Sequence, residues 1–184
     1  FSLLMNNSLK TPKKSLPFNW YYDEKTYQSE ITKIFNKEWV YICHVDSIKP
    51  MHYRTLKIDN KSIVLIKNNE EKISVFFNTC MHRGSQIFQE EEGKMHSPVI
   101  ICPYHQWSYK SSNGELLNTT SINYEKFSKK EYGLKNVNYH IWNGLIFINL
   151  GQNKNFSKKS VFQYYDDTFE KLNLNQFVTG HIWK

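Results

Sequence analysis

Cys80-Met81-His82 and Cys102-Pro103-Tyr104-His105 are the two short stretches that decide the fold and the chemistry of this chain. Each stretch offers one thiol and one imidazole, and residues 83–101 separate the two pairs. Thiolates and imidazoles are the side chains that bind zinc, copper and iron–sulfur centres. One such pair alone would say little, because a cysteine is often buried as a small hydrophobic residue. Two matched pairs, the second stiffened by its proline, predict a metal site with two sulfur and two nitrogen ligands.

The order of the four residues separates two kinds of metal centre. Structural zinc sites that use two Cys and two His group like with like, as Cys-x₂₋₄-Cys and His-x₃₋₅-His. Here each pair mixes the two residue types, and a single residue stands between Cys80 and His82. A Rieske [2Fe–2S] centre requires two cysteines on one iron and two histidines on the other. The sequence therefore favours an iron–sulfur centre, with structural zinc as the alternative.

The residues around both pairs resemble the cluster loops of the Rieske non-haem iron ring-hydroxylating oxygenases, in their large (α) subunit. The stretches that carry the resemblance are 77–84, 102–109, 35–44 and 142–150. The similarity as a whole runs from about residue 16 to residue 150, which is most of the chain. The resemblance implies that Cys80 and Cys102 bind one iron through sulfur. His82 and His105 would then bind the second iron through nitrogen.

Three residues beside these pairs are expected to support the cluster. Arg83 follows the first histidine, where its backbone N–H could bond a bridging sulfide, or its side chain could simply pair with a nearby glutamate. Trp107 is expected to pack over the second loop and exclude water. Tyr109 could place its hydroxyl beside a cysteine sulfur or merely fill the core, and the sequence does not decide between them. The family usually has glycine after the second histidine, whereas this chain has Gln106, which removes no ligand.

The same loops bear on the expected reduction potential. Rieske proteins of respiratory complexes resemble a different pattern, with an extra cysteine in each loop and a serine two residues after the second histidine. The corresponding positions here are Ser85, Tyr104 and Trp107, so no loop disulfide can form. Hydrogen bonds to the sulfurs help to set the potential. We therefore expect a low-potential centre of the oxygenase type.

Short apolar runs separated by turn residues follow one another through the middle of the chain. Such spacing predicts a mainly β fold, a small antiparallel Rieske-type β-sandwich whose two cluster-binding loops project at one end. The expected strands span 40–44, 53–58, 63–66, 73–77, 99–101, 107–110, 134–139 and 145–150. An N-terminal helix is predicted over 24–37, because Asp23 is a good cap and apolar residues recur on one helical face. A C-terminal helical segment is predicted from the apolar residues within 161–172.

The resemblance also implies how the chain is divided and what it does. Residues 1–38 would form an arm and a helix, 39–150 the Rieske [2Fe–2S] domain, and 151–184 a linker into a catalytic domain. In the resembled oxygenases that domain holds a mononuclear Fe(II) in a two-His, one-carboxylate site, and no such motif occurs in this sequence. The full-length protein is expected to be a mono- or dioxygenase, an oxidoreductase that hydroxylates or demethylates with O₂. The 184-residue segment would pass electrons to that iron without being catalytic itself.

A free-standing Rieske ferredoxin, an electron carrier without catalysis, is the alternative function. Such carriers look shorter than this chain and lack its N-terminal helix and the tail after residue 150. As an oxygenase subunit, the chain would take electrons from a ferredoxin or a flavin reductase and form a homotrimer or another homo-oligomer. The stretches 16–23 and 39–45 look most like members that act on quaternary ammonium compounds such as choline, betaine or carnitine, although aromatic-ring dihydroxylases share much of the same domain.

Composition and charge limit which partners and which cellular compartment are expected. The formal net charge of +7 comes almost wholly from scattered lysines, which form no stripe interleaved with aromatic residues, so no nucleic-acid partner is expected. No apolar run approaches the ~20 residues that a membrane span needs, so no membrane contact is expected. Two of the three cysteines belong to the predicted site. The third, Cys43, is expected to be a buried free thiol, which fits a reducing cytoplasm.

Overall fold

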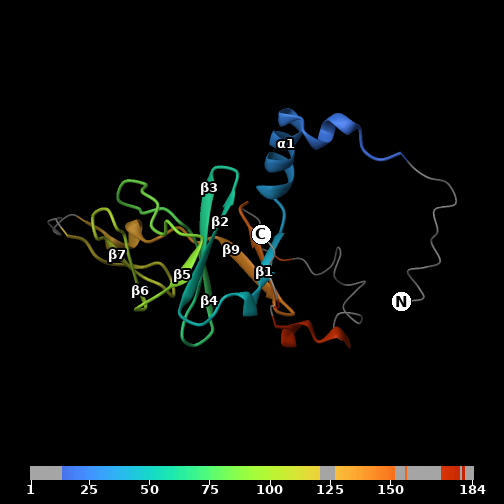
Figure 1. Ribbon diagram of the computed structural model, residues 1–184. Coiled ribbons are helices and arrows are strands. Elements are labelled where there is room, and N and C mark those ends of the chain that lie inside the picture. Colours follow the sequence, from blue (N-terminus) through green and yellow to red (C-terminus); the bar gives the residue numbers. More distant parts are fainter. Residues whose placement is uncertain (1–13, 121–126, 152–155, 157–170, 179, 181–184) are drawn as a thin grey trace.

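The computed structural model describes residues 14–120, 127–151, 156, 171–178 and 180 (Figure 1). Within these residues, three antiparallel sheets carry most of the regular structure, which confirms the predicted mainly β fold. The strands are β1 (Val40–His44), β2 (His52–Ile58), β3 (Lys61–Lys67), β4 (Ile73–Phe77), β5 (Glu92–Lys94), β6 (Val99–Ile101), β7 (Ser108–Lys110), β8 (Leu116–Asn118), β9 (Asn138–Trp142) and β10 (Leu145–Asn149). The helical segments are η1 (Phe18–Tyr21), α1 (Glu24–Glu30), η2 (Ile31–Phe35), η3 (Val45–Ser47), η5 (Lys129–Tyr132) and η7 (Leu174–Gln176). None of the helices described is long and apolar enough to cross a bilayer.

Strand β3 joins two hydrophobic cores, because both of its faces are buried. It lies inside the sheet β4–β3–β2–β5, and successive side chains of a strand point to opposite faces. Ile63 and Leu65 pack with Ile146 of the sheet β1–β10–β9. Val64 and Ile66 pack into the core of the third sheet, β6–β7–β8. This second core is the one that contains the two cysteines of the predicted metal site.

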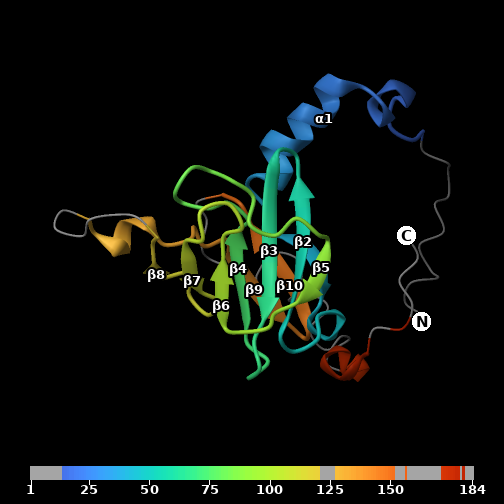
Figure 2. The ribbon, with the colours of Figure 1, turned by 60° about the vertical axis from the view of Figure 1, so that its left-hand side comes forward.

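The N-terminal helix begins where the sequence predicts. The Asp23 carboxylate accepts the backbone N–H of Thr26 at 2.8 Å, which caps the first turn of α1. The helix continues as the π-helical turn η2 and ends at Asn36. Figures 1 and 2 show it standing away from the sheets, attached to the start of β1. The predicted C-terminal helical segment lies almost wholly outside the described residues, at 157–170.

The hairpin between β9 and β10 corrects one predicted strand. The sequence predicts a strand over 134–139, but β9 begins and ends later, at Asn138–Trp142. Asn143 and Gly144 both have positive φ, 47° and 81°, as an Asn-Gly hairpin turn of two residues requires. The last residue of β9 and the first of β10 therefore pair directly across the turn. The turn, rather than the apolar run, sets where this strand ends.

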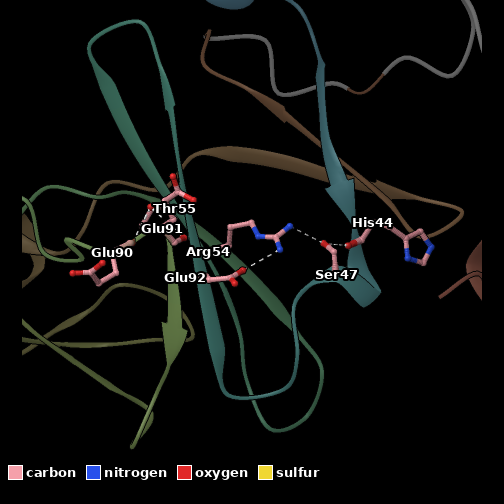
Figure 3. A network of polar contacts seen from close by, with 7 residues as sticks. All are labelled: His44, Ser47, Arg54, Thr55, Glu90, Glu91 and Glu92. Carbon is pink, nitrogen blue, oxygen red and sulfur yellow. Dashed lines mark hydrogen bonds and ion pairs between the residues drawn. The ribbon is translucent and has the colours of Figure 1, made fainter. Parts of the chain in front are cut away.

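A polar network ties the edge of the largest sheet to the end of β1 (Figure 3). On β2, Arg54 donates to the Ser47 hydroxyl at 3.3 Å and to the Glu92 carboxylate at 3.2 Å. Ser47 in turn donates to the backbone carbonyl of His44 at 2.7 Å. The Thr55 hydroxyl secures the segment before β5 by donating to two of its backbone carbonyls. These bonds hold the chain that leaves the first predicted metal-binding loop against the sheet.

Candidate metal centre

The first predicted Cys–His pair lies in a tight loop (residues 78–87) that follows β4. Within this first loop, the backbone N–H of Cys80 donates to the Ser85 carbonyl at 2.8 Å. The N–H of Gly84 donates back to the Cys80 carbonyl at 3.0 Å. Gly84 has a φ of 76°, a left-handed conformation that glycine adopts at no steric cost. The backbone thus holds His82 inside a closed turn.

The second loop (residues 102–107), between β6 and β7, repeats this backbone pattern with different residues. The N–H of Cys102 donates to the Trp107 carbonyl at 2.8 Å, and the N–H of Gln106 donates to the Cys102 carbonyl at 2.9 Å. Gln106 has a φ of 58°. Gln106, a residue with a side chain, therefore occupies the left-handed position that Gly84 fills in the first loop. The left-handed backbone explains why the family usually has glycine at the position of Gln106.

The four candidate donor residues form a buried sulfur side and a partly exposed nitrogen side. Cys80 and Cys102 are each 1% exposed and belong to the same hydrophobic core. The Nδ1 atoms of His82 and His105 face each other at 3.2 Å, and both rings are half-buried. The structure thus brings together the four residues that the sequence singles out, as two like pairs.

The separation of the donors into two like pairs suits a binuclear centre with one metal for each pair. The thiols lie deeper than the imidazoles, so each pair could bind a metal of its own. Two thiolates on one iron and two imidazoles on the other are the ligands of a Rieske [2Fe–2S] cluster. The donor set therefore fits that cluster.

Two hydroxyl groups lie against the cysteine sulfurs. The Tyr109 hydroxyl lies 3.1 Å from Cys80 Sγ and accepts the backbone N–H of Met81 at 3.2 Å. Tyr109 is also fully buried, so it both fills the core and contacts the sulfur. On the other side, Ser85 Oγ lies 3.5 Å from Cys102 Sγ. Sequence reasoning missed this second contact, because the sequence does not show which side chain of the first loop faces the cysteine of the second.

The surroundings of the two thiols move their pKa values in opposite directions. Burial raises the pKa of Cys80, and hydrogen bonds from Tyr109 and from the His82 backbone offset this only in part. Burial acts in the same sense on Cys102, but hydrogen bonds from the Ser85 hydroxyl and from backbone N–H groups outweigh it and lower the pKa. Burial, followed by the neighbouring Cys80 sulfur, raises the pKa of Tyr109 far above its ordinary value. The tyrosine hydroxyl therefore stays protonated and can donate.

The two other predicted supporting residues lie beside His82. Trp107 is 2% exposed and stacks on the His82 ring, with the ring centroids 4.7 Å apart and an interplanar angle of 13°. Its indole also meets two further aromatic rings edge-on, so the imidazole rests on an aromatic cluster. Arg83 is exposed. Burial, then the charges of His105 and Arg83, lower the pKa of His82, which favours the neutral imidazole that binds metals.

Comparison with known protein families agrees with the site. Residues 38–128 match the family model of the Rieske [2Fe-2S] domain. This range contains both loops and all four candidate donor residues. The fold and the site together therefore define a Rieske domain, whose cofactor is a [2Fe–2S] cluster.

The relatives of the chain are subunits of Rieske oxygenases. The chain is 33% identical over 154 residues to the 2-aminobenzenesulfonate 2,3-dioxygenase subunit alpha of Alcaligenes sp, with 82% of this chain and 38% of that protein covered. It is 34% identical over 140 residues to the glycine betaine monooxygenase oxygenase subunit of Pseudomonas aeruginosa, with 76% and 32% covered. Its fold matches the crystal structure of the apo form of the quaternary ammonium Rieske monooxygenase CntA, with a TM-score of 0.71 and 28% identity, over 86% of this chain and 45% of that one.

The chain therefore carries a Rieske [2Fe-2S] domain, and its relatives are α subunits of Rieske oxygenases. It spans 38% and 32% of the length of the two curated relatives. The relatives are mono- and dioxygenases, which are oxidoreductases. They do not favour the alternative of a free-standing Rieske ferredoxin.

Proposed function

We propose that this chain holds a Rieske [2Fe–2S] cluster between its two loops and transfers electrons through it. Cys80 and Cys102 would bind one iron through Sγ. His82 and His105 would bind the other iron through Nδ1. The observation that carries this assignment is the facing pair of Nδ1 atoms, 3.2 Å apart, beside two buried thiols. This contact supports the assignment because it places one nitrogen of each imidazole at a common point next to the loop cysteines.

When bound, the cluster supplies one-electron transfer, and the protein controls its surroundings. The buried side chains of Cys80, Cys102 and Trp107 keep water away from the sulfur side. His82 and His105 are only half-buried, so their rings offer the shorter route between the metal and a partner protein. With Nδ1 directed toward the other ring, Nε2 of each imidazole is left to hydrogen-bond a group on that partner.

The division of the chain follows from the same proposal. Residues 1–38 would comprise an arm and a helix, 39–150 the Rieske domain, and 151–184 a linker into a catalytic domain with a mononuclear non-haem iron. Electrons delivered to that iron would support O₂-dependent hydroxylation or demethylation. The two curated relatives, a dioxygenase and a monooxygenase, support this class of reaction.

A ferredoxin or a flavin reductase would supply the electrons, in the cytoplasm, and the full-length protein would form a homotrimer or another homo-oligomer. Inter-subunit electron transfer is described for a quaternary ammonium Rieske monooxygenase that shares this fold. That precedent supports an oligomer in which the cluster of one subunit serves the iron of its neighbour.

Reconstitution of the chain with iron and sulfide tests the ligand assignment. The chain is expected to bind about two irons and about two acid-labile sulfides and to absorb visible light, which a zinc site cannot do. Replacing either loop cysteine by serine, or either loop histidine by alanine, should abolish or sharply reduce iron binding. Cys43→Ala, which removes the buried thiol outside the loops, is the control and should keep the full iron content. A ligand variant with wild-type iron content and spectrum would contradict the assignment.

A further inference from the structure

We infer, building on the proposed function, that Ser85 raises the reduction potential of the cluster by donating its hydroxyl proton to the Cys102 sulfur. Ser85 is not an iron ligand in this scheme. It acts through Cys102 and is therefore a positioning residue. Neither the family match nor the relatives assign it a role.

The backbone of the first loop holds Ser85 in place. The Ser85 carbonyl accepts the N–H of Cys80 at 2.8 Å, and the left-handed Gly84 before it closes the turn. From this position the Ser85 hydroxyl reaches across to the second loop, where Oγ lies 3.5 Å from Cys102 Sγ. Sulfur is a larger and weaker acceptor than oxygen, so hydrogen bonds to it are correspondingly long.

Ser85 and Tyr109 form a crossed pair of donors between the two loops. Tyr109 follows the second loop and contacts Cys80 of the first, whereas Ser85 belongs to the first loop and contacts Cys102 of the second. The Tyr109 hydroxyl already accepts the N–H of Met81, so its single proton is left for the Cys80 sulfur. Each cysteine sulfur thus faces one hydroxyl group, from Tyr109 on β7 for Cys80 and from Ser85 of the first loop for Cys102.

A donor at either sulfur favours the reduced state of the bound cluster. Reduction adds negative charge, and a hydrogen bond to the more negative form stabilises it, so the potential rises. Cys102 is 1% exposed, which prevents bulk water from replacing the serine hydroxyl. The sequence predicts a low potential, because Trp107 stands where the Rieske proteins of respiratory complexes have a serine donor. The hydroxyls of Ser85 and Tyr109 partly replace that donor and raise the reduction potential above this expectation.

Ser85→Ala in the cluster-loaded chain tests this role. The redox equilibrium should shift roughly three- to tenfold toward the oxidised state, which lowers the midpoint potential by about 30–60 mV for a one-electron couple. Ser85→Thr keeps a hydroxyl and should stay close to the wild-type potential. Gln86→Ala is the matched control from the same loop, because the Gln86 side chain donates to the Phe88 carbonyl and not to a sulfur. Its potential should not move.

The outcomes separate this inference from the proposed function. An unchanged potential in S85A, at wild-type iron content, would overturn the role of Ser85 and leave the cluster assignment standing. A wild-type chain that binds no [2Fe–2S] cluster would overturn the proposed function instead. If S85A cannot be loaded, S85C and S85T decide the matter. A thiol is a weaker donor than a hydroxyl, so S85C must lie below S85T in potential, and equal potentials would overturn the inference.

Discussion

Gly84 and Gln106 occupy equivalent positions, each four residues after the cysteine of its loop, and both adopt the left-handed backbone conformation. At both positions the backbone N–H donates to the carbonyl of that cysteine. A residue with a Cβ is strained in this conformation by about 1 kcal/mol or more relative to glycine. The second loop therefore carries a local strain that the first loop avoids.

A glycine at position 106 and an alanine at position 84 should change the free energy of unfolding in opposite directions. Gln106→Gly should raise the free energy of unfolding by about 0.5–1 kcal/mol, because the strain relieved exceeds the extra freedom of the unfolded chain. Gly84→Ala should lower it by about 1 kcal/mol through backbone strain alone, since a Cβ there would meet nothing within 4 Å. Urea unfolding of both variants provides the measurement. A destabilising glycine at position 106 would show that its side chain makes contacts that outweigh the strain.

Trp107 couples the packing of the second loop to the orientation of His82. Trp107→Ala should cost about 3–5 kcal/mol of unfolding free energy, as the loss of a buried indole does elsewhere. It should also shorten the lifetime of the bound cluster, because the His82 ring loses the surface on which it stacks. Trp107→Phe keeps a ring and should cost less. Urea unfolding and the decay of visible absorbance report the two effects, and equal cluster lifetimes in wild type and Trp107→Ala would contradict the positioning role.

The buried thiol of Cys43 should make the stability of the chain depend on pH, independently of the metal site. Burial raises the pKa of its thiol, and the Ser47 hydroxyl and Arg54 only partly oppose this. The folded chain therefore keeps the proton at pH values where the unfolded chain has released it. The thiol's contribution to stability is full below its ordinary pKa of 9.0 and is lost as pH rises above it.

The test compares the wild type with Cys43→Ala. Between about pH 8 and about pH 10, the urea midpoint of the wild type should fall more steeply than that of the variant. Other groups also titrate in this range, and the variant shares them with the wild type. Parallel curves for the two proteins would mean that the Cys43 thiol has the same pKa in both states.

The ion pair between Arg54 and Glu92 joins a largely buried partner to an exposed one, with side chains 22% and 65% exposed. Glu92→Gln should therefore change the free energy of unfolding by less than about 1 kcal/mol. Arg54→Met should cost more, about 1–3 kcal/mol, because the Ser47 hydroxyl loses a donor inside the fold. Thermal unfolding of both variants measures the difference. If Glu92→Gln proved the more damaging change, the exposed ion pair would be the part of the network that matters.

The fold class and the two Cys–His pairs could be predicted because both are local patterns. The observed bounds of β1, β4 and β6 coincide with the predicted strands 40–44, 73–77 and 99–101, where short apolar runs end at polar or turn residues. Strand β5 could not be predicted, because Glu92-Gly93-Lys94 has no apolar residue and forms a strand only through pairing with β2.

Contacts made across the two loops could not be predicted from either loop alone. The distance between Ser85 and Cys102 depends on how β4 and β6 place the loops in space, which no local period records. The left-handed conformation of Gln106 is hidden for a different reason, because glycine is the usual signal for it and here glycine is absent. The sequence indicates Tyr109 as a candidate donor to a cysteine sulfur, but only the structure identifies that sulfur as the one of Cys80.

The central claim is that two histidines of this chain bind the iron–sulfur cluster. Electron spin echo spectroscopy of the reduced, cluster-loaded chain, prepared with nitrogen-15-labelled histidine, tests this claim most directly. The account predicts strong magnetic coupling of the cluster to nitrogen atoms of two labelled histidines. In His82→Ala and in His105→Ala, either one of these couplings or the whole cluster should be lost. A loaded cluster with no coupling to labelled histidine, or one whose couplings persist unchanged in both variants, would contradict it.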